Sequence, residues 1–229
     1  DPKVHEQNWL NCDPKQLISA ISLINKYGKE KGTRGLPRLL PGLNFIAGLN
    51  GESEITYQKN LDLLRKIKNQ GLWLRRINIR QVEGLNFQKV NEKHFQKFKR
   101  DVREEVDRPL LREMFPKGSI LRGVWWEAHD GRIRKPEHVI GPKHKDPNIN
   151  GEPGMTFGRQ IGAYPLLVGV PYKIPLETSS DVMVTGHGNR SISGVQLGID
   201  INLATQKQLE AIPGIGENSA WSIISKRAK

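Results

Sequence analysis

The feature that most constrains this fold is a succession of strand, glycine turn, helix and second strand between residues 43 and 82. Residues 43–47 are apolar enough for a buried strand, and the glycine turn GLNGES follows them. Ser53 opens a capping-box pattern, Gly71 stops the helix, and LWLRRINIRQV then alternates like a strand. We therefore predict a β-α-β unit, with two parallel strands covered by helices.

A parallel sheet this short cannot be covered on both faces by its own helices. Residues 14–27 add one amphipathic helix, begun by Asp13 and Pro14. Its predicted apolar face consists of Leu17, Ile18, Ile21, Ile24 and Tyr27. Only about one and a half β-α-β units are present, so the remaining strands should lie outside this chain. Because the sequence starts at Asp1 without an initiator methionine, we expect a fragment of a longer protein.

The rest of the chain predicts three further parts after a first part at residues 1–84. Residues 85–117 are helical and charged, which favours an amphipathic connector. Residues 118–198 hold short β-rich segments, which predict a small antiparallel β-barrel interrupted by a polar, mobile loop at residues 132–153. Residues 199–229 predict two short helices around PGIGE. The expected fold class is α/β, then β, then α.

Charge and cysteine content exclude several kinds of site. The 229 residues carry a net charge of +12 and have a pI near 9.9, which attracts nucleic acid or phosphorylated ligands. The single Cys12 excludes an internal disulfide and a complete iron–sulfur ligand set. His187 has no second ligand at metal-binding spacing, so we expect no metal ligands. No apolar run is long enough for a membrane helix, which predicts a cytoplasmic protein without membrane contacts.

The segment LEAIPGIGENSAWSII is the most specific local signal. Gly214 and Gly216 permit a sharp turn and a close approach of the backbone to another molecule, and the next helix begins with free N–H groups that attract phosphate. The segment resembles a helix-hairpin-helix, a module that binds DNA and RNA backbones, although Glu217 stands where many members carry Lys or Pro. The alternative is a hairpin that only packs against the rest of the protein. The residues expected to bind nucleic acid are Gly214, Ile215, Gly216, Asn218, Lys226 and Arg227.

The last strand of the first part has one polar face. Arg76, Asn78 and Arg80 alternate with apolar neighbours, so their side chains should share one side of the sheet. Asn50 and Gly51 should leave backbone amides open at the carboxyl end of the first strand, where parallel sheets bind ligands. Inside a barrel, such a face lines a ligand site. At a sheet edge, the same arginines would only be solvated.

The run from LISAISLINKYG through LNFIAGLNGESEITYQKNLDLLRKI to LRRINIRQV resembles the second half of a radical S-adenosylmethionine barrel, in an archaeal group that ends in a β domain and a helix-hairpin-helix. The resemblance implies that Ile46 packs against the adenine of S-adenosylmethionine. It also implies a 4Fe–4S cluster held by three closely spaced cysteines, which the parent protein would carry outside this chain. The implied cofactor-binding residues are Ile46, Gly48, Asn50, Gly51, Arg76, Asn78 and Arg80.

The β-rich region resembles the TRAM-like barrel of tRNA methylthiotransferases, which helps to hold RNA. The resemblance is carried by GMTFGRQIGAYPLLVGVP, in which Arg159 either binds a phosphate or buttresses the barrel. Together the resemblances imply the C-terminal fragment of a radical enzyme that acts on nucleic acid and lacks the N-terminal half of its own barrel. Its cofactor would yield a 5′-deoxyadenosyl radical that abstracts hydrogen, a reaction this chain cannot perform alone. The alternatives are a relative without a cluster, a non-enzymatic nucleic-acid-binding protein, and a scaffold whose hairpin contacts protein.

Overall fold

The computed structural model describes the chain except for residues 12, 83, 85–86, 127–154, 161–165 and 228–229. The described residues form two compact units. The first consists of Asp1–Gly32 and Leu36–Phe115, and the second of Thr33–Gly35 and Pro116–Lys229. Cys12 and the loop predicted at residues 132–153 therefore lie outside the described residues. The expected division into four parts stays a prediction.

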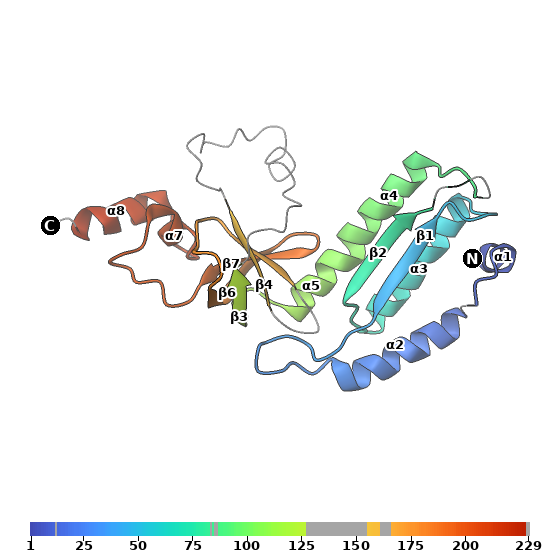
Figure 1. Cartoon of the computed structure of the whole chain (residues 1–229), viewed down its shortest axis with the longest axis horizontal. Coiled ribbons are helices and arrows are strands. Elements are labelled where there is room, and N and C mark those ends of the chain that lie inside the picture. Colours follow the sequence, from blue (N-terminus) through green and yellow to red (C-terminus); the bar gives the residue numbers. More distant parts are fainter. Residues whose placement is uncertain (12, 83, 85–86, 127–154, 161–165, 228–229) are drawn as a thin grey trace. The chain divides into compact units, whose positions relative to one another are not determined.

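The first unit is built around the predicted β-α-β motif (Figure 1). Strands β1 (Gly42–Ala47) and β2 (Arg76–Gln81) are parallel, with Leu43 opposite Ile77, and helix α3 (Glu54–Asn69) connects them. The remaining helices are α1 (Pro2–Gln7), α2 (Pro14–Gly28), α4 (Glu92–Val102), the π-helical segment η1 (Arg103–Asp107) and α5 (Arg108–Met114). The parallel pair and the helical character of the segment predicted as a connector are thus confirmed, and this segment belongs to the first unit.

Helix α2 begins as predicted, because the Asp13 side chain accepts a hydrogen bond from the Lys15 N–H at 2.9 Å. Its buried stripe differs from the prediction. Tyr27 is 68% exposed, and Asn25 is buried instead. The Asn25 amide donates to the Trp73 carbonyl at 3.0 Å and accepts from the Trp73 N–H at 2.7 Å. A polar side chain therefore joins α2 to the segment before β2, and apolar periodicity does not detect such a residue.

Helices α3 and α4 pack on the same face of the β1–β2 sheet. The Phe45 ring of β1 meets the Phe98 ring of α4 with centroids 5.8 Å apart, and the Tyr57 ring of α3 lies 5.5 Å from the same ring. Arg65 of α3 also reaches Glu105 of η1 at 2.7 Å. Edge-on aromatic contacts of this kind add to the burial of apolar area. One sheet face is therefore covered by the helices of the unit itself.

The second unit contains a closed barrel with the strand order β3-β4-β5-β7-β6. The strands are β3 (Ile120–Trp126), β4 (Thr156–Gln160), β5 (Leu167–Val170), β6 (Ser179–His187) and β7 (Ser191–Gln196). The predicted barrel is confirmed, but it is not wholly antiparallel, because β5 and β7 pair in parallel. Strand β6 lies between β5 and β7 in the chain and pairs with β7 in the antiparallel direction. Strands β5 and β7 point in the same direction.

The barrel interior combines apolar side chains with one satisfied amide donor. Val124, Trp126 and Val168 are fully buried. Gln160 is also buried, and its Nε2 donates to the Arg34 and Arg122 carbonyl oxygens at 2.9 and 3.0 Å. A buried amide that donates to acceptors on two backbone segments joins those segments, although its own oxygen finds no partner among the described residues.

Two short helices, α7 (Gln206–Glu210) and α8 (Glu217–Arg227), follow the barrel. Thr205 and Gln208 form a capping box at the start of α7, with the Gln208 Oε1 accepting from the Thr205 N–H at 2.8 Å. Leu209 and Ala220 form a small core, against which Ile212, Ile215, Ile223 and Ile224 pack. Within the described ranges, no helix is both long and apolar enough to cross a membrane.

Candidate functional site

The face of the β1–β2 sheet opposite α3 and α4 is bare and polar. Arg76 and Arg80 are exposed, and Asn78 is half-buried beside Asn44, to whose Oδ1 its amide donates at 2.8 Å. Ile46 is 41% exposed and lies opposite Arg80 in the strand register. The prediction that one face of β2 is polar is confirmed. The structure brings four of the expected cofactor-binding side chains together on this face.

The two arginines of this face have no partner among the residues that the structure describes. Elsewhere in the first unit, several basic side chains are paired with carboxylates, for example Arg65 with Glu105. An unpaired guanidinium offers up to five N–H donors in a planar fork that suits carboxylate or phosphate groups. The bare face therefore combines positive charge, amide groups and one apolar side chain.

The turn after β1 is packed more closely than the sequence predicts. Gly48 has a φ of +92°, and a Cβ there would lie 3.0 Å from the Val82 carbonyl oxygen. Its N–H donates to the Glu52 carboxylate at 3.1 Å, and its carbonyl oxygen accepts from the Gln88 N–H at 3.0 Å. Gly48 is required by this packing, and its backbone does not face a ligand.

The Asn50 amide is likewise engaged, so it is not open to a ligand as predicted. The Asn50 N–H donates to the Asn8 Oδ1 at 3.1 Å, and the Asn8 amide donates back to the Asn50 carbonyl at 2.8 Å. A Cβ at Gly51 would lie 2.0 Å from the Gln7 Oε1. The segment at the end of α1 thus covers the turn, a contact across more than 40 positions that the local sequence does not show.

Sequence reasoning also missed the pair formed by Glu52 and Tyr57. Both side chains are buried, and the Tyr57 hydroxyl donates a short hydrogen bond to the Glu52 carboxylate. Burial, and then this hydrogen bond, raise the pKa of the Tyr57 hydroxyl. The only sequence signal was a Tyr five positions after a Glu at a helix start. Because the Glu52 carboxylate also accepts from the Gly48 N–H, this pair supports the turn from its buried side.

The glycine turn between α7 and α8 is open, as predicted. Gly214 has a φ of +90°, and space lies around the position that a Cβ would take at Gly214 and at Gly216. Asn218, in the first turn of α8, is exposed. Ile215 instead packs against the small core, where it anchors the turn rather than facing outward. The backbone can thus approach another molecule closely here.

The predicted basic residues divide into two groups. Lys226 and Arg159 are exposed, and Arg159 alternates along β4 with the buried Gly158 and Gln160, which places it on the outside of the barrel. Arg227, also predicted to bind nucleic acid, is instead held inward in this structure. Its Nη1 donates to the Ala204 carbonyl at 2.8 Å, and its Nε and Nη2 are buried. Its position on the buried side of α8 turns the guanidinium inward.

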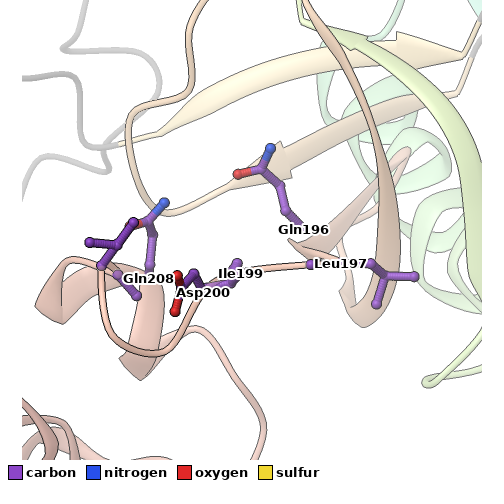
Figure 2. Close-up of a pocket in the computed structure, with 8 residues that line it drawn as sticks. Gln196, Leu197, Ile199, Asp200 and Gln208 are labelled. Atoms are coloured by element: carbon purple, nitrogen blue, oxygen red, sulfur yellow. The ribbon is translucent and has the colours of Figure 1, made fainter.

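A cleft of about 230 Å³ lies between the end of β7 and helix α7. Figure 2 shows it with the side chains of Gln196, Leu197, Ile199, Asp200 and Gln208 labelled. The Gln196 amide donates to Ser180, and oxygens of Asp200 and Gln208 accept from backbone N–H groups of the loops beside them. These polar groups support the loops, so the cleft carries no assigned chemistry.

The described residues contain no group of three or more His, Cys, Asp or Glu side chains that could hold a metal ion. His187 lies at the end of β6, in the turn to β7 that the Gly188 N–H closes by donating to the Ser191 carbonyl at 2.8 Å. The segment GHGNRS therefore forms a polar turn between two strands.

Comparison with known proteins finds relatives in archaea. No protein-family model matches this chain. An uncharacterized protein of Archaeoglobus fulgidus is 35% identical over 224 residues, which cover 93% of this chain and 38% of that protein. An uncharacterized protein of Methanocaldococcus jannaschii is 36% identical over 205 residues, which cover 85% of this chain and 34% of that protein. The chain is thus similar to about a third of the length of these longer archaeal proteins.

Proposed function

We propose that this chain is the C-terminal portion of a cytoplasmic radical S-adenosylmethionine enzyme that acts on nucleic acid. The observation that carries the proposal is the bare polar face of the β1–β2 pair. In a (β/α) barrel, helices cover the outer face of each strand, and the inner face lines the interior beneath the active site. Helices α3 and α4 cover one face here, and Ile46, Arg76, Asn78 and Arg80 occupy the other.

Exposed apolar residues on α2 support the same proposal. Leu23 is 59% exposed, and Tyr27 is also in solvent, on the side of α2 away from its buried stripe. Further helices of a barrel would cover such side chains, as neighbouring helices do in (β/α) folds. Relatives about three times as long as the matched segment have room for such elements.

The residues of the bare face fit S-adenosylmethionine in part. Ile46 offers an apolar contact for an adenine ring, and Arg80, its partner in register, offers a guanidinium to a carboxylate. Gly48, Asn50 and Gly51 act indirectly, because their tightly packed turn holds the end of β1 in place. The described residues supply no ligands for an iron–sulfur cluster. When bound in the complete protein, the cofactor and the cluster would supply hydrogen abstraction by a radical.

The second unit supports the nucleic-acid part of the proposal. The open glycines of the α7–α8 turn, the exposed Asn218 and Lys226, and a net charge of +12 fit a helix-hairpin-helix that binds a phosphate backbone. The closed barrel with the exposed Arg159 fits a TRAM-like domain. Arg227 contributes by holding α8 against the preceding loop.

Anaerobic reconstitution of the full-length Archaeoglobus fulgidus relative tests the enzyme. We expect bound iron and sulfide, and formation of 5′-deoxyadenosine from S-adenosylmethionine after addition of a strong reductant. The same preparation left without reductant is the control. Absence of a cluster, or no 5′-deoxyadenosine with the cluster present, would contradict the enzyme assignment.

A non-enzymatic nucleic-acid-binding protein is the second candidate, because the hairpin and the charge are sufficient for it. Binding of duplex DNA and structured RNA by the 229-residue chain, measured at two salt concentrations, should weaken steeply with salt under either function. Calorimetry with S-adenosylmethionine separates the two functions. If the chain binds S-adenosylmethionine and Arg80→Gln reduces the heat of binding, the radical enzyme is supported. If the chain binds nucleic acid in a salt-dependent way but does not bind S-adenosylmethionine, the second candidate is supported.

A further inference from the structure

Helix α8 carries an exposed tryptophan that phosphate binding does not use. Trp221 is 54% exposed, and its side chain makes no hydrogen bond or ring contact with the described part of the chain. By contrast, Trp73 and Trp126 donate their indole N–H groups to Glu113 and Ser180 at 2.7 and 2.8 Å. A tryptophan ring left in water with an unpaired N–H forms a large, flat contact surface.

The position of Trp221 on α8 places it beside the glycine turn. Helix α8 packs Ala220, Ile223 and Ile224 into the small core. At 3.6 residues per turn, Trp221 lies about 100° around the helix from Ala220, on the flank of the core-facing side, and Asn218, three positions before it, is adjacent to it. Helical side chains lean toward the N-terminus of their helix, so the Trp221 ring leans toward Asn218 and the turn.

The surroundings of this ring are polar and suit a nucleic acid better than an apolar protein surface. Ser222, Ser225 and Lys226 are exposed on the same helix, and none of them extends the apolar surface of the ring. Glu217, the only carboxylate on α8, lies four positions before Trp221, and Asn218 and Ser225 are the other polar side chains at neighbouring positions on the helix. An exposed aromatic ring with these polar neighbours, about one helical turn from an open glycine turn, offers adjacent places for a base and a phosphate of a single strand.

We propose that Trp221 stacks on an unpaired nucleobase of a strand whose phosphate lies at the turn of Gly214 and Gly216. The partner is therefore single-stranded nucleic acid, because the bases of an intact duplex are already stacked and paired. This inference rests on the proposed binding of nucleic acid by the hairpin. A stacked base changes the Kd by roughly 5-fold to 150-fold, the equivalent of about 1–3 kcal/mol.

Fluorescence anisotropy with the 229-residue chain tests the stacking. The probes are a labelled single strand of about 12 nucleotides, a length within the usual site sizes, and the same sequence as a duplex. Trp221→Ala should raise the Kd for the single strand by about 5-fold to 150-fold and change the Kd for the duplex by less than about 2-fold. Trp221→Phe, which retains a ring, should restore most of the affinity.

Trp9→Ala is the matched control, because Trp9 is 94% exposed in the first unit and is removed by the same substitution. It should leave both Kd values unchanged. Equal losses in the Trp9→Ala and Trp221→Ala variants, or equal losses for single strand and duplex, would overturn the stacking. So would an unchanged single-strand Kd in Trp221→Ala. Unchanged thermal unfolding of Trp221→Ala would show that the variant is folded, and the Trp221→Phe variant tests the ring if it is not.

The salt dependence separates this inference from the proposed function. Suppose that the unsubstituted chain binds nucleic acid with a steep salt slope. If Trp221→Ala then changes neither this slope nor the Kd, only the stacking is wrong. If the unsubstituted chain binds neither probe at low salt, the proposed nucleic-acid function fails, and the stacking fails with it.

Discussion

The two units of this protein differ in how far the edges and faces of their sheets are covered. In the second unit, five strands close into a barrel, so each strand has a neighbour on both sides. In the first unit, β1 and β2 pair with each other alone among the described strands, and one face of the pair is bare. A closed sheet has no unpaired backbone edge, whereas an open pair leaves polar groups and side chains for other partners. The barrel therefore pairs the edges of all its strands, whereas the open pair leaves polar side chains on one face exposed.

The strongest way to break this comparison is to remove a fully buried ring from the barrel. Trp126→Ala should lower the free energy of unfolding by about 3–5 kcal/mol, because the ring is buried and its N–H is bonded to Ser180. Amide exchange followed by NMR should show lost protection in β3–β7 and retained protection in α3 and β1. Ile46→Ala on the bare face, the control, should cost far less. Comparable losses for both substitutions would contradict the contrast between the units.

The stability of the first unit should depend on the buried hydrogen bond between Tyr57 and Glu52. Tyr57→Phe should destabilise it by about 1–3 kcal/mol, because the Glu52 carboxylate loses the donor that shares its buried site. Urea unfolding followed by circular dichroism measures the loss. Tyr27→Phe is the matched control, since Tyr27 is mostly exposed, and it should unfold at the same urea concentration as the unsubstituted chain. A neutral Tyr57→Phe would show that the pair does not hold the turn.

Alkaline pH should weaken both units through one buried tyrosine each. Burial raises the pKa of Tyr57 in the first unit and of Tyr172 in the second above the ordinary value of 10.0. The folded state thus holds these protons more tightly, and its stability is complete below pH 10 and falls as the pH rises above that value. Unfolding midpoints between pH 9 and 11 should fall less for Tyr57→Phe and for Tyr172→Phe than for the unsubstituted chain. Parallel pH curves would contradict this account.

A smaller effect is expected at the nucleic-acid end of the second unit. Glu217→Gln removes the only carboxylate of α8, which lies beside the open glycine turn. Weaker repulsion of phosphate should lower the Kd for a single-stranded oligonucleotide by about 2-fold to 5-fold at low salt, the size of an exposed charge interaction. Glu210→Gln on α7 is the control and should have less effect. A weaker complex for Glu217→Gln would place the phosphate elsewhere.

The smallest change in stability should follow from removing the arginines of the bare face. The double substitution Arg76→Gln and Arg80→Gln should alter the free energy of unfolding by less than about 0.5 kcal/mol, because neither side chain has a described partner. Urea unfolding checks this expectation. Arg65→Gln, which breaks the pair with Glu105, is the contrasting variant and should cost more. A large loss in the double variant would mean that these arginines support the fold rather than a ligand.

Local sequence patterns predicted most elements because each depends on neighbouring residues. The caps of α2 and α3, the parallel β-α-β unit and the two short helices α7 and α8 follow from periodicity and turn residues, and all are confirmed. The errors arose where distant residues decide. Asn8 accepts a hydrogen bond from the Asn50 N–H, and the Ala204 carbonyl accepts one from Arg227. Neither contact has a local signature in the sequence. The same limit hid the Glu52–Tyr57 pair and the burial of Asn25.

The sequence by itself determined which segments become strands and helices, and which face of β2 is polar, because these properties repeat with the period of the backbone. Only the tertiary structure decided which predicted groups remain available. It engaged the N–H groups of Asn50 and Gly48 with Asn8 and Glu52 and turned Arg227 inward, while it left Arg76, Arg80 and Trp221 exposed. The physical reason is that hydrogen bonding and burial depend on partners brought together by packing, which a one-dimensional pattern does not contain.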